Sequence, residues 1–592
     1  MAGGGIVRSM SSTSGRVPPL VKPKFTFYSL LLTILACLGG LLFGYDTGVM
    51  SSVMLFLPKN AGMKPMKTIW QELIVSITPG LAALSSLAAG KLSDVLGRRP
   101  IILFASIIFF LGAVVCGVAP EKYTLLAGRA LLGIAVGFAS MIVPVYISEA
   151  APSYIRGALI TVYQIMIAIG FIVANLVAVF CSQIDPVHMG WRLIFGFAAI
   201  PSVIQLIGFL YLKDTPRYLY KTGQKELCKD VLSQIYGNNR EWVQYDLDEI
   251  RDAIEEDAKA SKQMEDSFVP LRILHTPHVL KALVLGCSMQ MFQQLVGVNT
   301  LLYYTAKILR SAGVEDDITN LWIALGISVV QAVTALLPMK LIEQLGRRPV
   351  LLVSLMGIIV SLLLMGGTFV LINKDSQSID ISNRFNGVNE SRAKYEENFD
   401  FCSSMTSCDS CTTSPHCGHC YSQGDIGMGQ CLPLAYHDSE RSSIGHCDGS
   451  TTEKYIIKTT CTTKYTVIPV VIMLIYLISF SFGMGPMPWV FNAEIYPLWA
   501  RSTCVSLATF TNWIFNLFIS LTFLTLGEAI TKYGAFFLYA AFGTIGWFIF
   551  FFFVPETKGL PIEEVEKLFM TKEQRKEHHR LHQQKELEMA QY

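Results

Sequence analysis

Two short stretches decide the fold: Asp94-Val95-Leu96-Gly97-Arg98-Arg99 and Glu343-Gln344-Leu345-Gly346-Arg347-Arg348. Each consists of an acid, two further residues and Gly-Arg-Arg, and each stands between two apolar runs. Self-similarity at a long interval indicates an internal duplication. The sequence therefore predicts two related halves within one chain.

A second pattern of an acid, a proline and an arginine also occurs twice, as Glu149, Pro152 and Arg156 and as Glu494, Pro497 and Arg501. The interval between the first and the second pattern is longer in the second half of the chain. A hydrophilic, cysteine-rich stretch over residues 373–464 lies within that longer interval. We interpret this stretch as an insertion into one copy of the duplicated unit.

The repeated motifs lie between apolar runs that are long enough to cross a bilayer, which takes about 20 residues. The chain has 592 residues, of which 52% are hydrophobic and 16% charged, and its mean hydropathy is +0.44. The net charge of +2 gives no electrostatic ground for a nucleic-acid partner. We expect an all-α membrane protein with twelve spanning helices in two pseudo-symmetric halves, near residues 27–50, 70–90, 100–119, 123–147, 156–181, 191–212, 279–308, 317–342, 349–372, 465–494, 502–528 and 534–554.

Basic residues in short connections set the expected orientation, because such connections tend to face the cytosol. The arginines of both repeated patterns fall in alternate connections, so we expect both termini inside. The expected organisation is a cytosolic tail (1–26), a six-helix half (27–212), a cytosolic linker (213–278), a second half (279–554) interrupted by the extracellular stretch (373–464), and a cytosolic tail (555–592). Residues 224–236 and 246–262 read as amphipathic linker helices, either simply solvated or involved in gating.

Eight of the 14 cysteines lie in the inserted stretch: Cys402, Cys408, Cys411, Cys417, Cys420, Cys431, Cys447 and Cys461. Outside the cell an even number of crowded cysteines indicates disulfides, whose pairing the sequence leaves open. Zinc is the alternative, since His416 and His419 stand near paired Cys-x-x-Cys units. Asn389 opens the Asn-x-Ser triplet of a glycosylation acceptor.

The duplicated charges between the spans are candidate gate residues: Asp94, Arg98, Arg99, Glu149, Arg156, Glu343, Arg347, Arg348, Glu494 and Arg501. Charges at helix ends can pair across two halves when one end of the site is shut. Alternatively, the arginines only satisfy the preference for positive charge inside. The repeated spacing of the acids favours the gate.

One acid stands inside an apolar run: Asp46, within Gly40-Leu41-Leu42-Phe43-Gly44-Tyr45-Asp46-Thr47-Gly48. A carboxyl group in that setting is expensive unless it is paired, protonated or hydrated, so it indicates a functional site. Farther along the chain, Gln290, Gln293 and Gln294 share one helical face. Asn299 follows Gly297, where we expect local unwinding to turn the amide toward the same cavity.

With these residues in view, the chain resembles the sugar-porter branch of the major facilitator superfamily over nearly its whole length outside the tails and the inserted stretch. The matching segments are residues 90–99, Gly128-Arg129, 144–157, 293–299, Gly485-Pro486-Met487-Pro488-Trp489 and Pro555-Glu556-Thr557-Lys558-Gly559. The family usually shows Pro-Glu-Ser-Pro-Arg after span six, where this chain has Asp214-Thr215-Pro216-Arg217. The cysteine-rich loop between spans nine and ten is similar to that of proton-coupled myo-inositol transporters, and its spacing is similar to plexin-semaphorin-integrin modules.

The resemblance implies roles for individual residues. Asp46 matches an acid of the proton-coupled members, where passive carriers typically have asparagine, and its partner position is Arg129. We expect Asp46 to alternate between an ionised form paired with Arg129 and a protonated form; a static ion pair is the alternative. The implied sugar contacts are Gln164, Gln293, Gln294, Asn299, Gln331, Trp489, Asn512 and Asn516, although any single amide could only bridge helices. Tyr303 and Tyr304 are candidate outer-gate residues, with aromatic packing as the alternative.

The resemblance therefore implies a proton-driven symporter for a cyclic polyol such as myo-inositol, with the proton as coupling ion and no other cofactor or metal. A hexose transporter is the alternative, and a nutrient receptor that uses the cysteine-rich loop as its ligand-binding head is a third. The partners we expect are the polyol, protons and lipid, in a multi-pass protein of the plasma membrane. A partner of the loop stays open. The sequence shows no phosphate-binding glycine loop or nucleophile constellation, which argues against an enzyme.

Overall fold

The computed structural model describes residues 26–570 together with positions 19 and 23, with internal gaps at 153–154, 263–268, 315, 337–343, 377, 380–397, 415, 423–424, 436–437, 449–454, 459–460, 462 and 559–561. Within these residues, twelve helices are long and apolar enough to cross a membrane. This agrees with the twelve spans expected from the sequence. The predicted positions Asn389 and Glu343 lie outside the described residues.

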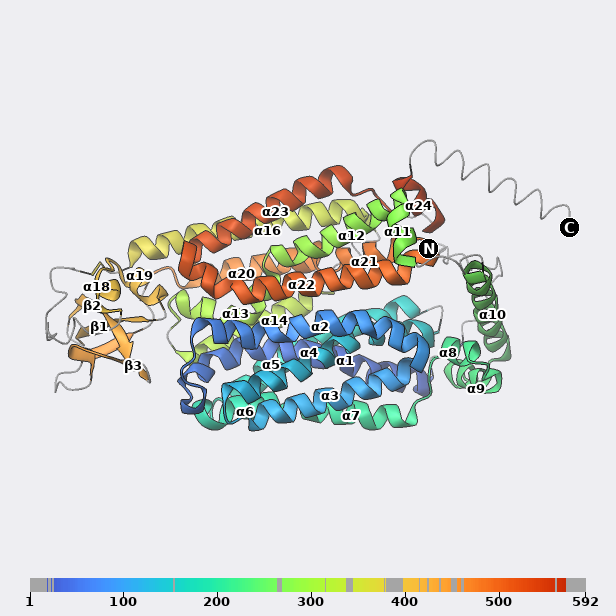
Figure 1. The fold of residues 1–592 in the computed structure, drawn as a ribbon, viewed down its shortest axis with the longest axis horizontal. Coiled ribbons are helices and arrows are strands. Elements are labelled where there is room, and N and C mark those ends of the chain that lie inside the picture. The colour runs from blue at the N-terminus through green and yellow to red at the C-terminus, as the bar shows by residue number, and fades with distance from the viewer. Residues whose placement is uncertain are drawn as a thin grey trace, which may run out of the picture.

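The spans form two bundles that lie side by side, with the first in blue to cyan and the second in green to red (Figure 1). The first half comprises α1 (Phe27–Phe56), α2 (Thr68–Leu96), α3 (Arg98–Val118), α4 (Lys122–Ala150), α5 (Arg156–Cys181), α6 (Trp191–Phe197) and α7 (Ala199–Tyr211). The second comprises α12 (Pro277–Leu295), α13 (Val298–Ser311), α14 (Asp317–Thr334), α16 (Arg347–Asp375), α20 (Val467–Ser479), α21 (Met487–Glu494), α22 (Leu498–Ile530) and α23 (Lys532–Phe553).

The linker between the halves is helical and lies at one end of the bundles, which we call the linker end (Figure 1). It comprises α8 (Pro216–Lys221), α9 (Lys225–Tyr236), α10 (Arg240–Lys262) and α11 (Val269–His275), and α24 (Ile562–Phe569) follows the last span. The apolar faces of α9 and α10 bury Val231, Leu232 and Trp242 in a small core of their own. The carbonyl of Ile235 accepts hydrogen bonds from Thr26 and Ser29, so α9 is attached to the start of α1.

The inserted stretch forms a small module at the opposite end, which we call the module end (Figure 1). It contains α18 (Phe399–Ser403), α19 (Cys408–Thr413) and an antiparallel sheet in the order β3-β2-β1-β4, formed by β1 (Cys417–Ser422), β2 (Asp425–Ala435), β3 (Asp438–Ser442) and β4 (Tyr455–Lys458). The expected disulfides are present, and the pairing that the sequence left open is Cys402–Cys417, Cys408–Cys461, Cys411–Cys431 and Cys420–Cys447.

The module is fastened to the second half. The carboxylate of Asp375, at the end of α16, accepts hydrogen bonds from the Thr463 hydroxyl and the Lys464 amide, so the two chain segments that lead to the module are joined at its base. Lys532 of α23 forms a 3.0 Å ion pair with Asp409 of the module. A cavity of about 1200 Å³ separates the module from the ends of the spans.

The glycines of the two Gly-Arg-Arg motifs have the same backbone conformation. Gly97 and Gly346 both have φ 98° and ψ 166°, and each immediately precedes a spanning helix. Residues with a side chain avoid this region of φ and ψ. A Cβ at Gly346 would also lie 2.7 Å from a carboxylate oxygen of Glu556. The repeated glycine is therefore required by the sharp turn between neighbouring spans.

We expect Gly346→Ala to lower the free energy of unfolding by about 1–3 kcal/mol, because alanine cannot adopt this backbone conformation without strain. The matched control is Gly367→Ala in α16, where a Cβ meets nothing within 4 Å. That change should be neutral or stabilising by about 0.5–1 kcal/mol. Thermal unfolding of the purified protein measures both; equal midpoints would contradict the assignment.

Candidate functional site

The centre of the first half contains a buried ion pair between Asp46 of α1 and Arg129 of α4. The Arg129 Nη1 donates to Asp46 Oδ1, and the two residues are 0% and 4% exposed respectively. The guanidinium also donates through Nε to the Ile74 carbonyl of α2 at 3.3 Å and lies 5.9 Å from the Phe195 ring. The structure thus brings together the acid and the arginine that the resemblance matched.

Close packing of α1 against α5 fixes the position of the acid. A Cβ at Gly44 would come within 1.9 Å of the Ile167 carbonyl oxygen, so only glycine permits this approach. In membranes, small residues let helix backbones approach closely and pack without a hydrophobic driving force. Gly44 therefore lets α1 pack directly against α5 two residues before Asp46, whose carboxylate pairs with Arg129 of α4.

A network of amides occupies the centre of the second half. Asn512 Nδ2 of α22 donates to Gln290 Oε1 at 2.8 Å and to Gln293 Oε1 at 2.7 Å. Gln293 Nε2 in turn donates to the carbonyls of Met484 and Gly485. These bonds fix the orientation of both glutamines, so the cluster presents an ordered set of uncharged donors and acceptors.

The expected break in span seven is present at Gly297, which adopts a left-handed conformation with φ 84° between α12 and α13. Beyond it, Asn299 Nδ2 donates to Gln294 Oε1 at 2.7 Å. The local unwinding therefore turns the Asn299 amide back toward the glutamines of α12, as the sequence led us to expect.

The other predicted contacts differ in their exposure. Gln164 of α5 is exposed, and Trp489 of α21 is 38% exposed. The side-chain oxygens of Gln331 and Asn516 are buried, and neither has a hydrogen-bond partner among the described residues. These atoms are available acceptors in a region already rich in amides.

The two predicted gate tyrosines differ in their surroundings. The Tyr303 side chain lies near Asn516 of its own half and near Thr47, which follows Asp46 on α1 in the other half. The Tyr304 hydroxyl donates to the Ser520 carbonyl at 2.9 Å, and its ring packs against Phe523, both within its own half. Tyr303 therefore bridges the halves, whereas Tyr304 fastens α13 to α22.

At the module end the two halves are in contact. The Ala306 amide of α13 donates to the Ser51 hydroxyl of α1 at 2.9 Å. Lys59, just after α1, forms a 2.8 Å ion pair with Asp317 of α14. Deeper in the interface, Asn175 of α5 donates to Ser328 of α14. The structure thus has a closed module end.

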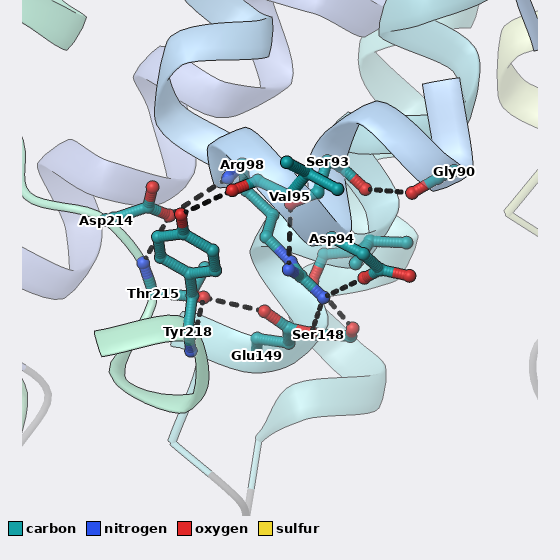
Figure 2. A network of polar contacts seen from close by, with 11 residues as sticks. Gly90, Ser93, Asp94, Val95, Arg98, Ser148, Glu149, Asp214, Thr215 and Tyr218 are labelled. Carbon is teal, nitrogen blue, oxygen red and sulfur yellow. Dashed lines mark hydrogen bonds and ion pairs between the residues drawn. The ribbon is translucent and has the colours of Figure 1, made fainter. Parts of the chain in front are cut away.

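At the linker end, the repeated charges of the first half gather around Arg98 (Figure 2). The Arg98 guanidinium contacts Glu149 at 3.0 Å and Asp94 at 3.1 Å. The Asp214 carboxylate accepts the amides of Arg98 and Arg99, and Thr215 donates to Glu149 at 2.6 Å. Burial raises the pKa of the Asp214 carboxyl, and these amide hydrogen bonds act in the opposite direction.

The second half repeats this cluster. Arg347 contacts Glu494 at 3.1 Å, Glu556 accepts the amides of Arg347 and Arg348, and Thr557 donates to Glu494 at 2.9 Å. The Arg501 guanidinium donates to the Tyr496 carbonyl. Every ion pair described in the two clusters joins residues of the same half, so the pairing across the halves that we expect for a closed linker end is not among the described contacts. The side chain of Arg156 lies outside the described residues.

The acid-threonine pairs Asp214-Thr215 and Glu556-Thr557 belong to segments that carry the family resemblance, but neither pair was assigned a role from the sequence. The structure places them in equivalent positions, since each acid caps the helix that begins at an Arg-Arg motif. Their signal was present in the sequence, because an acid followed by threonine stands directly after the last span of each half.

The fold and this pair of sites define a multi-pass membrane transporter with two six-helix halves. Residues 32–383 and 450–569 match the family model described as Sugar (and other) transporter, and the chain belongs to that family. A protein named Proton myo-inositol cotransporter hmit-1.2, from Caenorhabditis elegans, is 47% identical over 95% of this chain and 94% of its own length. A Homo sapiens protein named Proton myo-inositol cotransporter is 40% identical over 92% of this chain and 82% of its own length.

Solved structures of the same fold include the inward open conformation of the xylose transporter XylE from E. coli. The TM-score is 0.64 and the sequence identity 21%, over 92% of this chain and all of that chain. At this identity the likeness concerns the fold alone.

We expect Arg129→Leu to lower the free energy of unfolding by about 3–5 kcal/mol, because it leaves the Asp46 carboxylate buried without its partner. The double variant Asp46→Asn/Arg129→Leu removes both charges and should recover most of that loss. Thermal unfolding in detergent measures the two. A double variant as unstable as the single one would show that the arginine acts through packing alone.

Proposed function

We propose that this chain is a secondary active transporter that moves myo-inositol, or a related cyclic polyol, together with protons. The observation that carries the proposal is the Asp46–Arg129 pair, a carboxylate held inside the transmembrane bundle of a sugar-transporter fold. The names of the relatives at 40–47% identity support both the solute and the coupling ion.

In this mechanism Asp46 is the proton carrier. When Asp46 is ionised, the pair with Arg129 holds α1 against α4. When a proton neutralises the carboxylate, the attraction is lost and α1 is free to move relative to α4. Because Thr47, the next residue, lies beside Tyr303 of the other half, a shift of α1 reaches the interface of the halves directly.

The amides of the second half are the proposed polyol site. A polyol must exchange its hydrogen bonds to water for equivalent bonds in the protein, and uncharged amides serve both as donors and as acceptors. Gln290, Gln293 and Asn512 already form one ordered network, and Asn299 and Gln294 form a second amide pair beside the break in span seven. The indole of Trp489 offers an apolar surface for the ring face of the solute.

The repeated clusters at the linker end are proposed to hold each half together as a rigid body while the halves rock against each other. We place the linker end in the cytosol, because its arginines follow the positive-inside preference, and the module outside. The contacts between the halves at the module end close that side of the molecule, and we infer an inward-facing state from them.

The driving force is adequate. A proton that moves down about one pH unit gains about 1.4 kcal/mol, and a membrane potential of about 60 mV adds roughly the same. One proton per polyol therefore supports an accumulation of about 100-fold.

The test of the proposal is the current evoked by each solute in a cell that expresses the chain, at acidic and at neutral external pH. We expect an inward current with myo-inositol that grows with acidity, and a much smaller one with glucose. Equal currents with glucose would make the chain a hexose transporter. Uptake without current and without pH dependence would make it a passive carrier.

We expect Asp46→Asn to abolish the proton current, while exchange of labelled for unlabelled myo-inositol continues, because the amide cannot take up and release a proton. The control is Glu226→Gln, which removes an exposed acid from α9. It should leave the current unchanged. Proton currents of normal size in Asp46→Asn would disprove the role of this residue.

We expect Asn512→Ala to raise the KM for myo-inositol about tenfold. The change removes the two hydrogen bonds that orient Gln290 and Gln293, and the expected factor corresponds to the loss of one to two hydrogen bonds in the bound state. Thr522→Ala is the control on the same helix, since its hydroxyl donates to the Phe518 carbonyl of α22 and not to the amides. An unchanged KM in Asn512→Ala would place the polyol elsewhere.

A further inference from the structure

A second carboxylate is buried in the spans, away from the Asp46 site. Glu72 of α2 is 1% exposed. Its Oε1 accepts the Thr525 amide at 2.8 Å and its Oε2 accepts the Thr525 hydroxyl at 2.6 Å. Thr525 belongs to α22, so both bonds cross from one half of the molecule to the other.

Neighbouring residues extend this contact into a small polar cluster. Thr68 donates to Glu528 of α22 at 2.7 Å, and Lys307 of α13 donates to Gln71. On α2 the three residues Thr68, Gln71 and Glu72 share one face, because they are three and four positions apart. One face of α2 therefore bonds two helices of the other half, and we call these six residues the module-end latch.

The latch lies at the floor of the cavity beneath the module. Thr68, Gln71, Lys307, Thr525 and Glu528 line that cavity, whereas Glu72 lies buried below them. The latch contains the carboxylates of Glu72 and Glu528. Of the two, the Glu72 carboxylate is shielded from the cavity, and it accepts two hydrogen bonds from a single residue of the opposite half.

We propose that Glu72 is a positioning residue that sets the balance between the closed and the open module end. This inference rests on the proposed function, because a transporter with alternating access must separate its halves at each end in turn. The Glu72–Thr525 bonds then break in every cycle. A carboxylate makes stronger hydrogen bonds than a neutral acceptor, so its charge favours the closed form.

Two features make the contact suitable for this purpose. One donor is the main-chain amide of Thr525, which Thr525→Ala leaves in place, whereas the same change removes the hydroxyl donor. In addition, Glu72 stands on the first turns of α2, and its described hydrogen bonds go to Thr525 and involve neither the Asp46–Arg129 pair nor the polyol amides. Changing it should alter the balance of conformations without altering the binding of solute or proton.

The experiment measures opening of the module end directly, with a thiol reporter and a reagent that cannot cross the membrane. Ser51→Cys provides the reporter, because Ser51 is 3% exposed and faces Ala306 across the halves. The same chain without Ser51→Cys is the background control, because it measures the labelling of the six native free cysteines alone. Labelling needs no solute, so a failure of the inositol proposal would not affect this readout.

We expect Glu72→Gln to raise the rate of reporter labelling about tenfold. The neutral amide accepts a weaker hydrogen bond from Thr525 than the carboxylate does, so the open module end becomes more populated. Glu72→Ala should raise it further. Thr525→Ala should raise it less, because it leaves the main-chain amide in place. In Glu72→Ala/Thr525→Ala the second change should add little, since the hydroxyl has already lost its acceptor. Glu121→Gln, an exposed acid before α4, is the control and should have no effect.

Transport kinetics supply a second measurement, because KM and the maximal rate distinguish a shift in the conformational balance from a loss of folded protein. A more open module end should lower the KM for external solute in Glu72→Gln while the maximal rate falls, because the return of the carrier becomes harder. A variant that only folds poorly would lose maximal rate at constant KM. Unchanged labelling in Glu72→Gln, Glu72→Ala and Thr525→Ala at normal surface levels would overturn the proposal.

Discussion

An ion pair enclosed by apolar helices governs the rest of this molecule. Removing two charges from water is costly, and a carboxylate and a guanidinium can remain ionised there only as partners. Asp46 and Arg129 meet because glycines let α1 approach α5 and because a carbonyl of α2 supports the arginine. In the proposed mechanism the same constraint makes the pair sensitive to a proton, because neutralising Asp46 removes the attraction that holds α1 against α4.

The charges at the linker end act differently because they join the ends of helices instead of the middle of the spans. Each cluster joins the start of one span, the end of a second and the chain after the last span of its half, with Asp214 and Glu556 in matching positions. In the proposed mechanism, bonds of this kind keep the helices of each half together as one body. The interface between the halves is then left to contacts that can be made and broken, such as those of Tyr303, Ser51 and Glu72.

Much of this architecture follows from the sequence, because hydrophobic length, glycine conformation and internal repetition are local signals. The twelve spans and the break at Gly297 are of that kind. The contacts of Asp214, Glu556 and Glu72 are not, since their partners come from helix ends far away in the chain. Eight cysteines permit many pairings, and only the folded sheet selects one. The role of Tyr304 also needed the structure, because neighbouring tyrosines in one helix point to different partners.

The clasp of Asp375 on Thr463 and Lys464 bears on how the protein is made. It holds the two ends of a long insertion together between α16 and α20. For the packing of these two spans, the insertion is therefore equivalent to a short connection. The module can then acquire its disulfides on the oxidising side during biosynthesis, while the spans assemble in lipid. Its sequence is consequently free to diverge, or to be exchanged for another domain, at little risk to the transmembrane core.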